Sequence, residues 1–254
     1  MFYKMCRFSL ATVVWSCLVA TAAAQTLSPI QITKKPLGLP LIGSVYTAAS
    51  DSRSLAYSAK QQTYANYITT NLQEGVAFTG IGLNQLDPQR LYFLFNYQPR
   101  VYFIYGYAGY IDGLGATIAT LSQPSSSILS GNTFTIFSDG HWNGSTSRTT
   151  TYPVLPGDFV DLPMVNAGQQ LAFFIYSNED SNGNPGNVFY NGKANNPDNF
   201  QHMIAFFPDN SQYIIIGFED FYGGGDQDCN DLMFVVDIGP QNALILKNPN
   251  TLPK

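Results

Sequence analysis

The sequence predicts an all-β fold, an antiparallel β-sandwich of jelly-roll type. Three observations predict it. From residue 76 onward, short runs rich in aromatic and β-branched residues alternate with loops rich in Gly, Asn, Ser and Pro. No long helical pattern separates these runs, and no repeat of constant period is present, which weighs against a propeller or a solenoid. With 18 Phe and 16 Tyr among 254 residues, the chain can bury a large core.

Residues 1–24 are typical of a cleaved secretory signal peptide. Lys4 and Arg7 give a positively charged start, residues 8–20 are largely apolar, and three alanines at 22–24 resemble a cleavage site. The apolar stretch is too short to span a membrane comfortably, and no later stretch is long enough. We therefore expect a secreted, periplasmic or cell-surface protein with no transmembrane segment after cleavage.

The remainder of the chain is acidic and contains one cysteine. Without Lys4 and Arg7, ten basic residues remain against 17 acidic ones, a net charge of −7. This charge argues against a nucleic-acid partner, which requires a basic surface. Cys6 and Cys17 leave with the signal peptide, so Cys229 has no intramolecular disulfide partner. The loops must then be held by the hydrophobic core or by a metal ion.

Residues 25–90 are predicted to form an N-terminal leader that packs on the sandwich or extends it. Three prolines between residues 25 and 45 favour an extended segment with at most one edge strand, because proline cannot donate to a β-ladder. Residues 50–72 lack Gly and Pro, and they are predicted to form a short helix that begins near Ser50 or Asp51.

Residues 91–240 are predicted to form the sandwich itself. The tail at 241–254 is expected to add an edge strand or to fray. About nine runs have the composition of strands, and the first of them falls in the leader. They are residues 76–82, 90–96, 100–107, 133–137, 159–162, 170–176, 202–207, 213–216 and 232–236.

An acidic loop rich in glycine joins the last two predicted strands. Gly223 to Gly225 allow the backbone to turn sharply, which brings the acidic residues on both sides together. Like charges at this density repel one another unless a cation lies among them, and hard oxygen ligands favour calcium over zinc. The predicted Ca²⁺ ligands, arranged about one ion, are Glu219, Asp220, Asp226, Asp228, Asn230 and Asp231.

The alternate spacing of Asp226, Asp228 and Asn230 is similar to the start of an EF-hand loop. The remainder of that motif is missing, because Asp231 stands where Gly is required and an apolar strand follows. The alternative to a metal site is a solvated acidic hairpin in which Asp and Asn serve as turn formers.

A second loop repeats the alternation of oxygen ligands with Asp180, Asn182 and Asn184. Most of these ligands are neutral, so a calcium ion would bind them more weakly. A mobile surface loop is the favoured interpretation, and a second calcium site is the alternative.

The sequence contains no recognisable catalytic constellation. It has two histidines, no Gly-x-Ser-x-Gly elbow and no His-Glu-x-x-His motif. Carboxylates flank Cys229, and they raise the pKa of a thiol instead of activating it. His202 begins an apolar run and is predicted to be a buried histidine bonded to a backbone carbonyl. We expect that the protein is not an enzyme.

Three stretches occur in an order that marks a known family. They are Tyr-Ala-Gly-Tyr-Ile-Asp-Gly-Leu-Gly at 107–115, Val-Asn-Ala-Gly-Gln-Gln-Leu-Ala-Phe-Phe-Ile-Tyr-Ser-Asn at 165–178, and the segment from His202 to Gly-Gly-Asp-Gln-Asp-Cys-Asn-Asp at 224–231. Together, residues 102–238 resemble the bacterial secreted domain-of-unknown-function family 4114, a module also found in LruC-type surface proteins. Asp112 stands where that family usually has Asn, and Cys229 stands where an aromatic residue is common. The resemblance implies a secreted, calcium-binding β-sandwich without assigned chemistry.

These observations favour a secreted, calcium-stabilised β-sandwich that serves in surface binding, adhesion or envelope structure. The expected partners are calcium and a surface glycan or protein. The alternative is a lectin-like or carbohydrate-active domain whose calcium is structural. For that alternative, five tyrosines could line a sugar-binding face: Tyr92, Tyr102, Tyr105, Tyr107 and Tyr110. The other interpretation of these tyrosines is packing between neighbouring strands.

Overall fold

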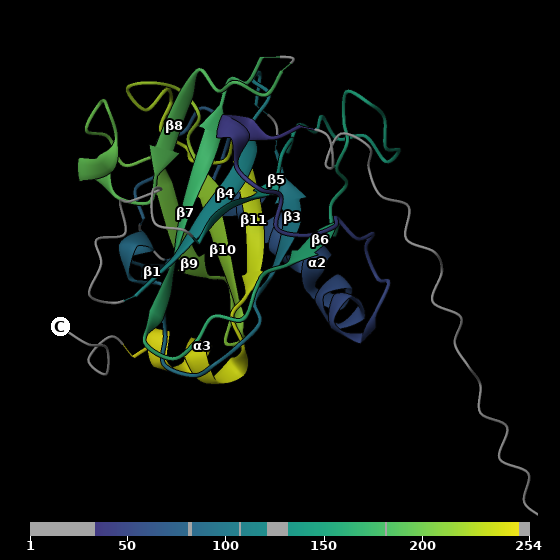
Figure 1. Ribbon diagram of the computed structural model, residues 1–254, viewed down its shortest axis with the longest axis vertical. Helices are drawn as coiled ribbons and strands as arrows, with labels where there is room; N and C mark the ends of the chain where they lie inside the picture. Colours follow the sequence, from purple (N-terminus) through teal and green to yellow (C-terminus); the bar gives the residue numbers. More distant parts are fainter. Residues whose placement is uncertain (1–33, 81–82, 107, 121–131, 181, 249–254) are drawn as a thin grey trace, which may run out of the picture.

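Two antiparallel β-sheets face each other across a hydrophobic core, which confirms the predicted all-β sandwich (Figure 1). The computed structural model describes residues 34–80, 83–106, 108–120, 132–180 and 182–248. The predicted signal peptide, the start of the predicted leader, Tyr107 and residues 249–254 lie outside the described residues. Within the described part, no helix is both long enough and apolar enough to cross a bilayer.

The first sheet has six strands in the described residues, in the order β1–β9–β10–β11–β3–β6. Neighbouring strands are antiparallel throughout. The pairing of β10 with β11 runs from Tyr213 opposite Asp237 to Phe218 opposite Leu232, so the acidic loop lies at the second of these ends. The strands are β1 (Asn84–Leu86), β3 (Arg100–Tyr105), β6 (Phe159–Asp161), β9 (Met203–Phe207), β10 (Tyr213–Phe218) and β11 (Leu232–Asp237).

The second sheet has the order β2–β7–β4–β5, and β8 pairs with β7 beside this path. Its strands are β2 (Tyr92–Phe93), β4 (Gly113–Thr120), β5 (Thr133–Phe137), β7 (Gln169–Ser177) and β8 (Asn187–Tyr190). The sequence did not predict β1, β4 or β8, and the predicted run at 90–96 contains only the two residues of β2. β4 is rich in Gly and Ala, which have low β-propensity.

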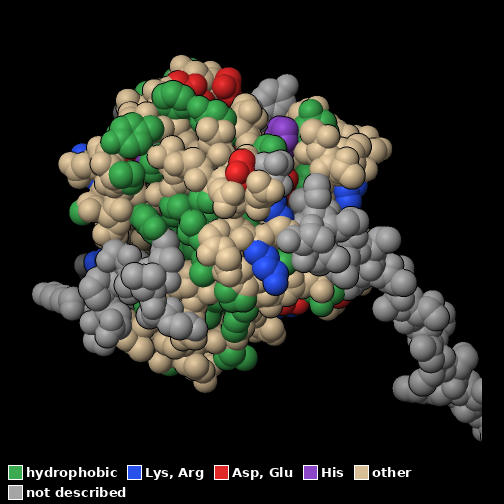
Figure 2. Space-filling view, turned by 45° about the horizontal axis from the view of Figure 1, so that its top comes forward, with side chains coloured by type: hydrophobic (Ala, Val, Ile, Leu, Met, Phe, Trp, Pro, Cys, Tyr) green, Lys and Arg blue, Asp and Glu red, His purple; other side chains and the backbone are tan. Residues whose placement is uncertain are grey.

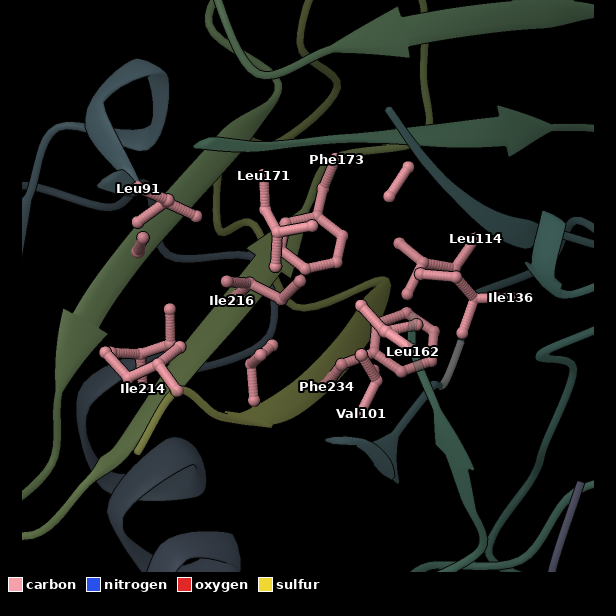
Figure 3. Close-up of a cluster of buried hydrophobic side chains, with 14 of the residues drawn as sticks. Leu91, Val101, Leu114, Ile136, Leu162, Leu171, Phe173, Ile214, Ile216 and Phe234 are labelled. Carbon is pink, nitrogen blue, oxygen red and sulfur yellow. The ribbon is translucent and has the colours of Figure 1, made fainter. Parts of the chain in front are cut away.

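The core lies between the facing sheets. Figure 3 shows Leu114 and Phe173 of the second sheet beside Ile214, Ile216 and Phe234 of the first. Alternate residues of a strand point to opposite faces, so Tyr213 and Ile215 of β10 point away from this core. They belong to a second buried cluster on the outer face of the six-stranded sheet. The six-stranded sheet is therefore covered on both faces.

Helix α2 (Ser52–Asn71) provides the cover for that outer face. Asp51 caps it, because its side chain accepts a hydrogen bond from Ser54 N while the Ser54 hydroxyl accepts one from Asp51 N. The helix has 20 residues and lies within the stretch 50–72, where a helix beginning near Ser50 or Asp51 was predicted. Its buried face is aromatic, and the Tyr57 ring stacks on that of Tyr102 at 3.9 Å between centroids.

The segment before α2 crosses the edges of both sheets instead of adding a regular strand to either. Ile42 N donates to Thr135 O of β5 at 3.0 Å, and Thr135 N donates to Pro40 O. Tyr46 exchanges two backbone hydrogen bonds with Phe159 of β6. Edge strands otherwise expose unpaired backbone groups, so this segment protects the edges at β5 and β6. Before it, Pro36–Gly38 forms the 3₁₀ helix η1.

Two expectations are wrong. Residues 76–80 form no strand, because this backbone bonds to the acidic loop instead: Phe78 N donates to Gln227 O at 2.6 Å. The tail begins with a helix, α3 (Pro240–Leu246), in which Pro240 occupies the first turn, where its missing N–H leaves no bond unmade. Ala243 and Leu246 of α3 are buried in the main core, which explains why this part does not fray. Two short 3₁₀ helices, η2 (Pro88–Arg90) and η3 (Lys193–Asn195), complete the described elements.

Candidate metal centre

The candidate metal centre lies in the loop that joins β10 to β11. Because Phe218 and Leu232 are paired, Glu219 and Asp231 begin the two arms of the loop beside each other. Gly225 folds back onto the first arm with a φ of +41°, and a Cβ on it would overlap Glu219 Oε1. Glycine at this position therefore allows the close approach that brings the two arms together.

Three predicted ligands converge at the base of the loop. Glu219, Asp220 and Asp231 each place one carboxylate oxygen within 4.8 Å of the others. Glu219 is 2% exposed and Asp220 5% exposed. Asp231 Oδ2 accepts a hydrogen bond from Asp220 N at 2.9 Å, which fixes one arm against the other. The six-stranded sheet thus holds three carboxylates around a common point.

The charge at this point is not balanced within the described residues. Glu219 Oε2 is buried and has no hydrogen-bond partner there. Burial, reinforced by the charge of Asp231, raises the pKa of Glu219 to about 9. Burial and the neighbouring Asp220 raise the pKa of Asp231 to about 7. Such an arrangement is unfavourable by itself, because a buried carboxylate needs hydrogen bonds or an opposite charge.

Asp112 adds a fourth carboxyl group from the other sheet. It directly precedes β4, is 2% exposed, and its carboxyl group hydrogen-bonds to that of Asp220. Asp112 Oδ1 also accepts a bond from Asn178 N at 3.0 Å. Burial and the charge of Asp220 raise the pKa of Asp112 well above its usual range. Sequence reasoning treated Asp112 only as a departure from the family pattern. The resemblance at 107–115, which gives Asn at this position, was the available signal, because Asn is also an oxygen ligand.

The other predicted acidic ligands form a second group. Asp226 and Asp228 gather with Glu74, again with one oxygen each within 4.8 Å. Asp228 is buried, whereas Glu74 and Asp226 are exposed. Glu74 lies just after α2, far away in the chain, and no local pattern in the sequence pointed to it. The structure therefore places the predicted acidic ligands in two groups and not around one point.

Asn230 and Asp228 attach the end of α2 to the loop. Asn230 Nδ2 donates to Leu72 O at 3.3 Å, and Asp228 Oδ2 accepts from Gly75 N at 2.9 Å. Burial raises the pKa of Asp228. The acidic loop thus contacts the predicted leader as well as both sheets.

His202 helps to hold the acidic loop in place. Its ring is fully buried and stacks on Phe189 at 3.6 Å between centroids. Its Nδ1 bonds to Glu219 O, and its Nε2 bonds to Asp198 Oδ2, both at 2.8 Å. The same Asp198 oxygen accepts from Gly223 N at 2.7 Å. The predicted buried histidine bonded to a backbone carbonyl is confirmed, and it holds the start and the turn of the loop in place.

Two other candidates do not join this centre. Cys229 is 4% exposed, and burial together with the charges of Glu219 and Asp228 raises the pKa of its thiol. Asp180 is exposed, and its two carboxylate oxygens accept hydrogen bonds from Asn182 N, Asn184 N and Asn184 Nδ2. These bonds make the Asp180 loop an internally bonded turn.

The predicted tyrosine face divides into separate environments. Tyr102 lies buried between α2 and the six-stranded sheet, and Tyr105 packs edge-on against Trp142 at 6.0 Å between centroids. The Tyr92 ring faces the guanidinium of Arg90. Tyr110 differs, because its ring lies beside Phe221 of the acidic loop.

Residues 165–239 match the sequence family described as Domain of unknown function (DUF4114). The resemblance noted from the motifs is therefore confirmed for this stretch, which runs from just before β7 to just after β11 and contains the whole acidic loop. Glu74 and Asp112 lie outside it. No curated protein and no solved structure matches the chain.

Proposed function

We propose that this protein is a secreted, calcium-binding β-sandwich that serves as a non-catalytic binding or adhesion module at a surface. The observation that carries the proposal is Glu219. Its Oε2 atom is buried without a hydrogen-bond partner in the described residues, and its carboxylate places one oxygen within 4.8 Å of oxygens of Asp220 and Asp231. A divalent cation there supplies the missing partner and removes the repulsion among the carboxylates.

The donor set favours calcium. Glu219, Asp220 and Asp231 offer only oxygen ligands, and Asp112 provides another carboxyl group beside them. Calcium takes six to eight oxygens in flexible geometry, whereas zinc prefers nitrogen and sulfur. Both ring nitrogens of His202 are already bonded to oxygens, so this histidine is not available as a zinc ligand.

The position of the ligands gives the ion a structural role. Glu219 and Asp231 lie at the ends of β10 and β11 in one sheet, and Asp112 lies at the start of β4 in the other. A cation held among these groups ties the two sheets together at one end of the sandwich. Binding to the folded state alone then stabilises the fold by an amount that rises with the logarithm of the free calcium concentration once this exceeds the dissociation constant.

The remaining parts of the proposal are supported by the sequence and by the lack of a reactive group at the site. The charged and apolar pattern of residues 1–24 supports export. The Cys229 thiol is buried and its pKa is raised, which is the opposite of an activated nucleophile. Both observations favour an extracellular module that binds without performing chemistry.

Calorimetric titration of residues 25–254 with calcium tests the proposal. The variants are Glu219→Gln in the first carboxylate group, Asp226→Asn in the second, and Asp87→Asn as an exposed control. We expect the wild type and the control to give the same binding heat, and Glu219→Gln to lose it. Heat retained in Glu219→Gln and lost in Asp226→Asn would move the site to the second group. No heat in the wild type would refute calcium binding.

A further inference from the structure

Two exposed aromatic side chains directly follow the buried carboxylates of the acidic loop. Phe221 is 50% exposed and Tyr222 is 53% exposed, although Glu219 and Asp220 before them are almost fully buried. Among the described residues, they are the only large exposed hydrophobic side chains that are adjacent in the sequence. In Figure 2, acidic side chains at the upper end of the view gather beside hydrophobic ones.

These rings are held in place. The Tyr110 ring lies 6.1 Å from that of Phe221, centroid to centroid, with only 8° between their planes. Tyr222 Oη donates to Pro197 O at 3.4 Å. The backbone beyond them is fixed as well, because Gly224 N donates to Phe221 O at 2.9 Å. We call Tyr110, Phe221 and Tyr222 the aromatic platform. A platform fixed before binding loses little conformational entropy when a ligand stacks on it.

The size of the platform favours a ligand with small rings. Its half-exposed side chains offer on the order of 250 Å² of surface. A stable protein interface buries about 800 Å² on each partner, which is far more than this patch supplies. The patch instead has the dimensions of one or two sugar rings stacked against aromatic side chains.

The charges near the platform favour a neutral ligand. Glu74 and Asp226 are exposed in the same loop region, and the chain beyond the predicted signal peptide carries a net charge of −7. This surface repels anionic lipid headgroups and nucleic acids. It offers carboxylate oxygens as hydrogen-bond acceptors, and Asn199 is exposed in the turn that receives Tyr222. A molecule with an apolar ring face and many hydroxyl donors satisfies both features.

We infer that the aromatic platform binds a neutral saccharide by stacking, and that the cation in the acidic loop is required for tight binding. The inference rests on the proposed function, because the two rings belong to the loop that would hold the cation. In the sequence, Phe221 and Tyr222 follow the proposed ligands Glu219 and Asp220 and precede the turn at Gly223 to Gly225. A cation bound by Glu219 and Asp231 adds to the contacts that already hold the two rings, because it holds the base of the loop that presents them.

A microarray of neutral oligosaccharides, probed with residues 25–254 in calcium and in EDTA, tests the inference. The strongest array ligand is then titrated against Phe221→Ala, Tyr222→Ala and Asp231→Asn. Phe95→Ala is the matched control: its ring is 42% exposed, and its backbone bonds to Asn242 of α3, at the opposite end of the sandwich. Calcium binding by each variant is measured separately by calorimetry.

We expect the two platform variants to bind the saccharide about tenfold more weakly while retaining the calcium heat of the wild type. Asp231→Asn loses both, and Phe95→Ala loses neither. Calcium binding without any array ligand, or saccharide binding unchanged by the platform substitutions, overturns the inference and leaves the proposed function intact. Equal saccharide binding in EDTA overturns the dependence on the cation. Binding to phosphatidylcholine vesicles that is lost in Phe221→Ala, with no array ligand, would assign the platform to a membrane instead.

Discussion

Both ends of the sandwich carry clustered carboxylates, but among the described residues only one end pairs them with guanidinium groups. At the end where α2 begins, Arg100 is 4% exposed and donates to both oxygens of Asp51 and of Asp161, at 2.7 to 2.9 Å. Arg53 donates to the fully buried Asp237 at 2.8 Å. Each of these carboxylates therefore has a guanidinium partner.

At the acidic end, no Lys or Arg among the described residues forms an ion pair with Glu219, Asp220 or Asp231. The pKa values of the carboxyl groups at the two ends reflect this difference in pairing. The hydrogen bonds from Arg100 lower the pKa of Asp51 to about 2, whereas burial raises the pKa of Glu219 to about 9. One end is complete as a structural ion-pair network. The other has no such cationic partner among the described residues, and we propose that a calcium ion takes that place.

The largest expected effect is at the paired end. Arg100→Met leaves Asp51 and Asp161 facing each other without the guanidinium, so we expect a loss of about 3 kcal/mol in the free energy of unfolding. Calcium affinity should not change, because the acidic end is untouched. Urea denaturation checks the first result and calorimetry the second. Lys193→Met, which removes an exposed cation, is the control. A stability equal to that of the control would show that the network is not needed.

The next effect concerns the shape of the acidic loop. Gly225→Ala forces Glu219 away from its position, and we expect calcium affinity to fall at least about tenfold. Gly223→Ala is the matched control: its φ of +82° carries a similar backbone penalty, but an added Cβ meets no atom within 4 Å. Calorimetric titration of both variants separates the two effects. Equal calcium affinities would contradict the placement of Glu219.

A substitution at the acidic end should change the free energy of unfolding in the opposite direction from Arg100→Met. Asp231→Asn removes one of the mutually repelling charges and keeps an oxygen that can accept from Asp220 N. We expect the calcium-free protein to gain about 1 kcal/mol of stability at pH 8. Urea denaturation in EDTA provides the measurement. Destabilisation in EDTA would mean that this carboxylate is already balanced without a cation.

The smallest effect is a pH dependence at the paired end. The pKa of Asp51 is lowered from 3.8 to about 2, so its contribution is complete above pH 3.8 and is lost as pH falls toward 2. Because the Asp51 side chain is 41% exposed, we expect at most about 1 kcal/mol. Asp51→Asn keeps a cap for α2 but not the charge. The stability difference between wild type and variant should therefore shrink between pH 4 and pH 2, and a constant difference would contradict the pairing.

The sequence predicted eight of the described strands at sites where aromatic and β-branched residues cluster, but it did not reveal β4. The reason lies in packing. An added Cβ at Gly115 would overlap the Phe174 ring on the neighbouring strand β7, so β4 requires glycine at this position. Small residues carry little β signal of their own. A strand whose composition is set by its neighbour cannot be recognised from local pattern.

Some residues of the candidate site could likewise be predicted from the sequence, and others could not. Glu219, Asp220 and Asp231 were predictable because the loop that carries them is continuous and visibly acidic. Glu74 and Asp112 come from other parts of the chain, and only the packing of the α2 end and of β4 brings them to the loop. The tertiary contacts also divided one predicted cluster into two groups, since Asp228 accepts a hydrogen bond from Gly75 N and gathers with Glu74 and Asp226.

The most direct test of the unpaired acidic end is the melting temperature of residues 25–254 in EDTA and in excess calcium, for the wild type and Asp231→Asn. At calcium concentrations a hundredfold above the dissociation constant, we expect the wild type to melt on the order of 5 to 10 °C higher than in EDTA. The variant should melt at the same temperature in both. A wild-type melting temperature that does not change with calcium would contradict the account that a cation completes this end of the sandwich.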